Sequence, residues 1–260
     1  MPRANRYIVA GRIYHITHRC HDRALLLKFA QDREAYRSML REHLQDARTL
    51  SLLTYCITSN HTHLLLTTRD APEAISRFMQ LLEGEFAKYY NRRKKRTGAF
   101  WEDRYHATMI DGGEYLWNCL KYIDLNMVRA GVVGHPSEWE WTGYQELSGR
   151  RKRYRMLDVE RLYEGLGGRQ EAEFRTNYDA ALTAARGNQE LSRDEKWTES
   201  LAVGRQNFVE EVGRGIRNRM NVEVEQSGSG WVLRESKEAY SRFSGQKIGS
   251  KGSFSAVSSV

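Results

Sequence analysis

The most constraining feature of the sequence is a pair of apolar, strand-like segments that only two residues separate. The segments are residues 51–58 (SLLTYCIT) and 61–67 (HTHLLLT), and Ser59-Asn60 joins them. Two residues are enough to join antiparallel neighbours in a β-hairpin, whereas a parallel pair needs a much longer crossover. The sequence therefore predicts an antiparallel sheet built around this hairpin.

Segments on both sides of the hairpin extend this pattern. Residues 13–19 (IYHITHR) alternate as a strand does, and residues 107–110 form a candidate last strand. Apolar side chains at helical spacing predict helices over 33–47 and 71–93. The resulting order, β-α-β-β-α-β, matches a split βαβ arrangement. We therefore expect an α+β fold, a ferredoxin-like or RRM-like antiparallel sheet with helices on one face.

The rest of the chain differs in composition from this core. A charged segment at 150–155 has the character of a linker, so we expect a first domain over residues 1–148 and a helical C-terminal extension over 149–240. The Ser- and Gly-rich residues 241–260 are expected to form a disordered tail. No stretch approaches the roughly 20 apolar residues of a membrane span, which predicts a cytoplasmic protein without a membrane partner.

The charge of the chain favours a polyanionic partner. The formal net charge is +8, and residues 1–100 hold 18 Lys and Arg against 9 Asp and Glu. The densest part is the run Arg92, Arg93, Lys94, Lys95 and Arg96, which is suited to gripping phosphates. A solvated basic loop is the alternative interpretation, because many basic proteins bind no nucleic acid.

Two histidines follow the hairpin joint in the segment Asn60–Leu66. His61 and His63 are two residues apart on a predicted strand, so their side chains point to the same face. Paired imidazoles are common metal ligands. A polar pair on the solvated face of an edge strand is the alternative, and two histidines alone do not define a metal site. A third ligand is required.

A predicted helix over 113–130, ended by Gly131, supplies a second pair of candidate residues. Tyr122 and Asn126 are four residues apart, which places them on one helical face, one turn from each other. Asn126 offers a carbonyl oxygen and Tyr122 a phenol, although a half-buried core tyrosine is the alternative. Asp124 lies about 200° round the helix from Tyr122 and is expected to point away from them.

Four segments in order resemble the HUH family of single-strand DNA nucleases, and more closely the REP-associated tyrosine transposases, a branch of its single-tyrosine transposases. They are Gly-x-x-Tyr-His-Ile-Thr at Gly11–Thr17, the two-histidine strand, Gly-x-Phe-Trp-x-x-Arg-Tyr at Gly98–Tyr105 and Tyr-Ile-x-x-Asn-x-Val-Arg-Ala-Gly at Tyr122–Gly131. The resemblance covers residues 1 to about 145. The sequence departs from the usual family residues at Ser59, Thr62 and Met127.

The resemblance implies a catalytic chemistry for these residues. Tyr122 would be the nucleophile, joined to a 5′ phosphate as a phosphotyrosine while a 3′ hydroxyl leaves. The metal ligands would be His61, His63 and Asn126, and ligation by imidazole and oxygen suits Mg²⁺ or Mn²⁺. The expected activity is that of a DNA nickase and strand-transferase.

The resemblance also implies a DNA partner. The expected substrate is single-stranded DNA beside a hairpin-forming, REP-like palindrome. Besides the basic run, Arg104 is expected to contact DNA, and Trp101 or Tyr105 to stack on a base, with core packing as the alternative for Trp101. No nucleotide cofactor is expected because no GxxxxGK[ST] motif occurs. Monomer and homodimer both stay open.

Two other classes compete with this interpretation. A relaxase or rolling-circle initiator would share the chemistry. A non-catalytic or domesticated single-stranded nucleic-acid-binding protein would share the fold. His15, His18 and His21 are expected to be structural or to contact phosphates, because His15 and His21 lie on opposite or distant faces. His106 and His135 have no assigned role.

Overall fold

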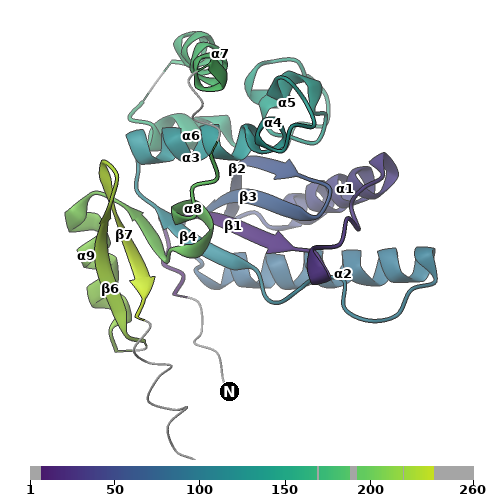
Figure 1. Cartoon of the computed structure of the whole chain (residues 1–260), viewed down its shortest axis with the longest axis horizontal. Coiled ribbons are helices and arrows are strands. Elements are labelled where there is room, and N and C mark those ends of the chain that lie inside the picture. The colour runs from purple at the N-terminus through teal and green to yellow at the C-terminus, as the bar shows by residue number, and fades with distance from the viewer. Residues whose placement is uncertain (1–6, 169, 188–191, 219, 237–260) are drawn as a thin grey trace, which may run out of the picture.

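The computed structural model describes residues 7–168, 170–187, 192–218 and 220–236. Its first elements follow the expected order, as Figure 1 shows. They are β1 (Ile13–Arg19), the 3-10 helix η1 (His21–Arg23), α1 (Ala30–Asp46), β2 (Leu50–Ile57), β3 (His61–Thr68), α2 (Glu73–Lys94) and β4 (His106–Ile110). The strand and helix bounds fall within a few residues of the predicted ones, so this part of the fold is confirmed.

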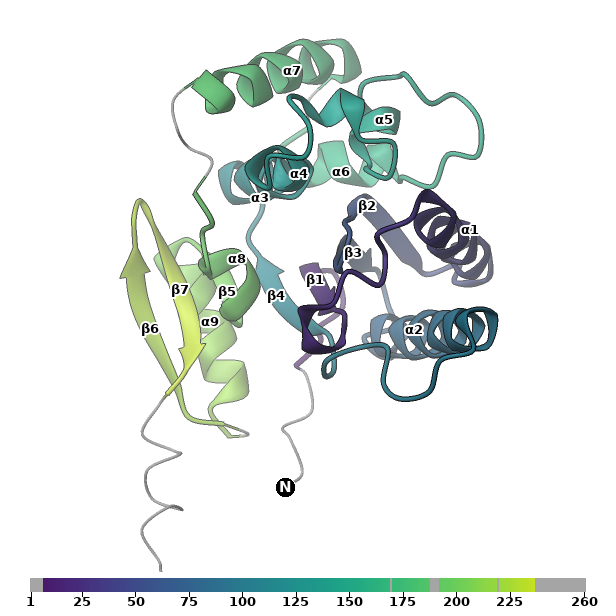
Figure 2. The ribbon, with the colours of Figure 1, turned by 45° about the vertical axis from the view of Figure 1, so that its right-hand side comes forward.

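The four strands form the antiparallel sheet that the sequence predicts. Their order is β2-β3-β1-β4, which is the order of a ferredoxin-like sheet, and each neighbouring pair is antiparallel. The crossover helices α1 and α2 cover one face and lie side by side in Figure 2. A buried hydrogen bond of 2.8 Å from the Tyr36 hydroxyl to Glu83 Oε1 joins them.

A third helix covers the opposite face, where the sequence analysis expected none. This helix, α3 (Glu114–Asp124), buries Leu116, Leu120 and Ile123 completely. The physical reason lies in β2 and β3, whose residues are buried on both faces almost without interruption. Strands whose residues are buried on both faces require cover on both sides. The sheet is therefore enclosed between α1 and α2 on one face and α3 on the other.

The C-terminal part contains helices, as predicted, and also three strands that were not predicted. The helices are α4 (Asn126–Arg129), α5 (Tyr144–Leu147), α6 (Val159–Gly165), α7 (Glu171–Gly187), α8 (Lys196–Glu199) and α9 (Gln206–Ile216), with a 3-10 turn η2 (Pro136–Glu138). The strands are β5 (Ala202–Gly204), β6 (Val222–Ser227) and β7 (Gly230–Glu235). None of the described helices is long and apolar enough to cross a membrane.

The new strands extend the sheet to seven, in the order β2-β3-β1-β4-β5-β7-β6. Strand β5 pairs in parallel with β4, with Met109 opposite Ala202. Asp111, after β4, accepts three hydrogen bonds from Arg205, and these bonds lower the pKa of the carboxyl against the effect of its burial. The sheet thus continues across the expected boundary between residues 148 and 149. The expected tail, residues 241–260, lies outside the described residues.

Candidate active site

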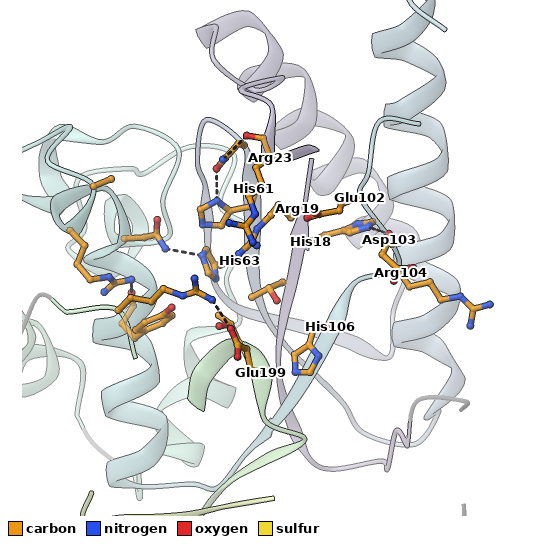
Figure 3. A pocket seen from close by; sticks show the side chains of 18 residues that line it. His18, Arg19, Arg23, His61, His63, Glu102, Asp103, Arg104, His106 and Glu199 are labelled. Carbon is orange, nitrogen blue, oxygen red and sulfur yellow. Dashed lines mark hydrogen bonds and ion pairs between the residues drawn. The ribbon is translucent and has the colours of Figure 1, made fainter. Parts of the chain in front are cut away.

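An open cavity of about 750 Å³ lies at one end of the sheet, between β1, β3, β4 and the α3–α4 segment. The strand register explains why the polar side chains meet there: Arg19 pairs with His61, and Thr17 pairs with both His63 and His106. Paired residues on neighbouring strands point to the same face. Figure 3 shows His61 and His63 next to each other in this cavity. Tyr122 and Asn126 line it from the helical side.

His61 stands at the start of β3, where the hairpin joint fixes its ring. The ring Nδ1 lies 2.7 Å from Asn60 Oδ1 and 2.9 Å from Thr58 Oγ1, so the Nδ1 proton has two acceptors. Burial is the largest cause that lowers the pKa of His61, to about 3, and nearby arginines lower it further. His61 is therefore neutral at physiological pH, with its Nε2 lone pair available.

His63 is 1% exposed and has partners at both ring nitrogens. Its Nδ1 lies 2.8 Å from His15 Nε2, and its Nε2 lies 2.8 Å from Asn126 Nδ2. Burial holds the pKa of His63 well below its ordinary value, and His61 and His15 lower it further. A neutral imidazole is the form that binds metal ions.

Asn126 reaches His63 although the predicted helix over 113–130 is not continuous. The helix breaks at Leu125, with φ −77° and ψ 1°, and resumes as α4 at Asn126. Gly131, with φ +67°, ends it as predicted. The Asn126 amide donates to His63 Nε2, and turning the amide over would present its oxygen to an ion bound there.

The side chains of His61, His63 and Asn126 are chemically suited to bind a small divalent cation. The described residues contain no group of three or more His, Cys, Asp and Glu placed to hold a metal ion. A metal ion bound by His61 and His63 would need a further ligand, and the Asn126 amide lies within 2.8 Å of His63 Nε2. Such a set leaves coordination positions for phosphate and water.

Tyr122 is 8% exposed and lies beside the histidines, its ring centroid 6.1 Å from that of His63. Arg129 packs on the Tyr122 ring, with its guanidinium carbon 4.1 Å from the centroid, and donates to the Tyr122 carbonyl at 2.7 Å. Burial raises the pKa of Tyr122, whereas the charges of Arg129 and Arg193 lower it. Two arginines thus favour the phenolate in a site that otherwise disfavours it.

Asp124 points away from the cavity, as the helical phase predicts. Its carboxylate accepts hydrogen bonds from the hydroxyls of Thr142 and Tyr178, at 2.5 and 2.6 Å. Burial raises its pKa to about 6, and these bonds partly oppose the effect. Asp124 therefore connects α3 to α7 and takes no part in the cavity.

The basic run lies apart from the cavity, and several of its members make contacts within the protein. Arg93 and Lys94 belong to α2 and form ion pairs with the fully buried Asp32. Arg96 donates to Asn91 Oδ1 and to the carbonyl of Ala99. Arg92 and Lys95 are exposed. Lys94 is exposed too, despite its ion pair, so a role of the run in DNA binding stays a prediction that rests mainly on these three side chains.

Trp101 and Arg104 differ in their position relative to the cavity. Trp101 stacks on His18, with ring centroids 4.3 Å apart, and its indole donates to the carbonyl of Glu83 at 3.1 Å. These contacts favour the core-packing alternative for Trp101. Arg104 is exposed at the cavity edge, and in Figure 3 its side chain extends away from the two histidines.

The cavity also contains arginines that the sequence analysis did not single out. They are Arg19, Arg23, Arg129 and Arg193. Arg19 and Arg129 had a sequence signal, because Arg19 continues the Thr17 face of its strand and Arg129 lies in the Tyr122–Gly131 motif. Arg193 and the neighbouring Glu199, which pair at 2.7 Å, come from the C-terminal part, where no motif marks them.

Comparison with known proteins gives a family match over the part of the chain that forms most of the cavity. Residues 9–126 match the family model described as "Transposase IS200 like". This range includes β1 to β4 and the residues His61, His63, Tyr122 and Asn126. The resemblance to the tyrosine transposases is thereby confirmed for this segment.

Two solved structures are similar over part of the chain. One is a REP-associated tyrosine transposase bound to a REP hairpin, 19% identical, with a TM-score of 0.45, over 61% of this chain and 93% of its own. The other is a provisionally described transposase from Deinococcus radiodurans, 17% identical, with a TM-score of 0.33, over 51% of this chain and 92% of its own. A search of curated proteins found no match.

Proposed function

We propose that this chain is a single-tyrosine transposase: a metal-dependent single-strand DNA endonuclease and strand-transferase whose nucleophile is Tyr122. The observation that carries the proposal is the convergence of His61, His63, Asn126 and Tyr122 on one arginine-lined cavity. The family match over residues 9–126 supports the same class of enzyme. A DNA-binding protein without catalytic function would not require a buried tyrosine between two neutral imidazoles and two arginines.

In the proposed reaction the Tyr122 oxygen attacks the phosphorus of a DNA phosphodiester. The phenolic proton passes to solvent, a bond forms between phosphorus and Tyr122 Oη, and the bond from phosphorus to the 3′ oxygen breaks. The 3′ oxygen leaves with a proton as a hydroxyl, and the 5′ phosphate stays on the protein. A 3′ hydroxyl later reverses these steps, so that resealing or transfer to another strand needs no nucleotide cofactor.

The protein groups around Tyr122 prepare it for this attack. Arg129, packed on the ring, and Arg193 oppose the burial that raises the pKa of Tyr122. His61, His63 and Asn126 would hold Mg²⁺ or Mn²⁺. The bound ion would neutralise charge on a non-bridging phosphate oxygen.

The substrate that we propose is single-stranded DNA next to a REP-like hairpin. A duplex would keep the phosphate away from Tyr122, which is only 8% exposed. Five arginines line the cavity against three carboxylates, which favours a phosphate backbone: Arg19, Arg23, Arg104, Arg129 and Arg193 against Glu102, Asp103 and Glu199. The hairpin preference rests on the four ordered sequence motifs.

A nicking assay tests the proposal. Hairpin-tailed single-stranded DNA is incubated with the full chain in Mn²⁺, in Mg²⁺ and in EDTA. We expect cleavage with either metal and none in EDTA, together with a protein–DNA adduct that resists denaturation. Cleavage that is undiminished in EDTA would mean that the histidines are structural.

Asn126 and Asp124 provide a matched pair of variants for the metal site. Asn126→Ala should lower cleavage roughly 10- to 100-fold, and raised Mn²⁺ should partly restore it, because one weak ligand is lost while the imidazoles stay. Asp124→Asn should leave the dependence on Mn²⁺ unchanged, since Asp124 bonds to Thr142 and Tyr178 outside the cavity. Titration of nicking against Mn²⁺ concentration measures both, and the opposite pattern would contradict the proposed ligand set.

The basic run gives a prediction about DNA affinity. Replacing the exposed Arg92 and Lys95 by Gln should reduce the slope of log affinity against log salt by about 0.7 for each lost phosphate contact. Arg93→Gln should instead lower the free energy of unfolding, by about 1–3 kcal/mol, because it leaves Asp32 without its closest partner. Binding at several salt concentrations and denaturant unfolding separate the two effects. An unchanged slope would mean that the run is only solvated.

A further inference from the structure

A third histidine, His15 of β1, lies fully buried behind His63 and outside the set of proposed ligands. The two imidazole rings meet edge to edge, with centroids 5.0 Å apart and planes 16° from parallel. His15 Nε2 lies 2.8 Å from His63 Nδ1, and His15 Nδ1 lies 2.8 Å from the backbone carbonyl of Trp197. A chain of two hydrogen bonds therefore runs from the C-terminal part of the protein to His63.

When both imidazole rings are neutral, only one placement of their protons allows both of these hydrogen bonds to form. The Trp197 carbonyl can only accept, so His15 carries its proton on Nδ1 and presents a lone pair at Nε2. His63 must then carry its proton on Nδ1 to donate to that lone pair. The remaining His63 lone pair is on Nε2, the nitrogen that lies 2.8 Å from Asn126 and faces the cavity.

The Trp197 carbonyl, at the far end of these two hydrogen bonds, is itself held in place by the fold. The single hydroxyl proton of Thr108 in β4 is shared between the Ser200 carbonyl, at 2.7 Å, and the Trp197 carbonyl, at 3.2 Å. The carbonyl thus contacts the side chains of both His15 and Thr108, which are opposite each other in the register of the neighbouring strands β1 and β4. Partners of this kind, which hold a metal-binding histidine by its second nitrogen, fix its tautomer and ring orientation.

We propose that His15 is a positioning residue that, together with the Trp197 carbonyl, holds His63 as the tautomer whose Nε2 is free to bind the metal ion. The inference rests on the proposed function and deepens it. It assigns part of the metal site to residue 197, which lies beyond the segment that carries the family match. It also replaces the expectation that His15 is merely structural or contacts phosphate.

The direct test is made on the wild-type protein. Nitrogen-15 NMR of the histidine side chains in the metal-free full chain should find His63 and His15 protonated on Nδ1 and not on Nε2. His63 protonated on Nε2 would overturn the inference. The His63 signals are assigned by their loss in His63→Ala.

Two variants then test the consequence for metal binding. His15→Leu removes the acceptor, so Mn²⁺ affinity without DNA, measured by the electron paramagnetic resonance signal of free Mn²⁺, should fall roughly 10- to 100-fold. His15→Gln keeps an acceptor at the reach of Nε2 and should recover part of the loss, and excess Mn²⁺ should restore nicking by both variants. Equal affinity of wild type and His15→Leu would overturn the inference alone. Failure of the wild type to bind Mn²⁺ would overturn the proposed function and the inference with it.

Discussion

Tyr122→Phe is expected to abolish nicking, with a loss of at least about three orders of magnitude, while binding of hairpin DNA stays near that of the wild type. Only the hydroxyl is lost, and without it no covalent intermediate forms. The phenylalanine ring keeps the packing against Arg129, which stacks on the ring face. Product formation in a gel assay measures the first effect, and a filter or mobility-shift assay measures the second.

Two other tyrosines are suitable controls for this variant. Tyr115 and Tyr105 lie in the same part of the chain, and neither lines the cavity around His61 and His63. Tyr115→Phe and Tyr105→Phe should therefore keep nicking within a few-fold of the wild type. If Tyr122→Phe keeps some adduct formation that disappears when Tyr115 or Tyr105 is also replaced by Phe, that result would identify the second tyrosine as the nucleophile.

His63→Ala should have the second-largest effect, a loss of Mn²⁺-dependent nicking of more than about 100-fold. The expected loss exceeds that for an outer partner such as His15 because the ligand itself is removed and Asn126 and His15 both lose their partner. His61→Ala should behave similarly. Rates over a range of Mn²⁺ concentrations measure the loss.

His43→Ala is the matched control for the histidine variants. His43 lies on α1, on the other face of the sheet from the cavity, and pairs with Glu85 at 2.9 Å. We expect its nicking to equal that of the wild type. Undiminished activity of His63→Ala would refute the metal site, whatever the behaviour of the other variants.

The β2–β3 pairing, and the grouping of site residues on one face of a strand or helix, could be predicted from the sequence because each depends on local spacing. The two-residue hairpin joint fixes β2 beside β3, and the spacing of two residues places His61 and His63 on one face. The spacing of four brings Tyr122 and Asn126 together even though the helix breaks at Leu125. Asp124 points away from the cavity for the same reason.

The contributions of the C-terminal part could not be predicted, because they depend on tertiary contacts. Strand β5 has three residues, too few for a detectable alternation, and it forms because β4 offers it an edge. The Trp197 carbonyl has no side-chain signature in any sequence, yet it bonds to His15. The arginines of the basic run are conspicuous in the sequence, but Asp32 binds Arg93 inside the fold.

The most direct measurement of the central claim is the chemical identity of the protein–DNA adduct. The full chain reacts in Mn²⁺ with hairpin-tailed DNA labelled at either its 5′ or its 3′ end, and the denatured adduct is digested with trypsin and sequenced by mass spectrometry. Trypsin cuts after Arg104, Lys121 and Arg129, so residues 122–129 form a peptide separate from the one that holds Tyr105 and Tyr115. We predict that the adduct retains the 3′-end label and that the nucleotide is on Tyr122 through a 5′ phosphate. An adduct that retains the 5′-end label, or a nucleotide on any other residue, would contradict the account.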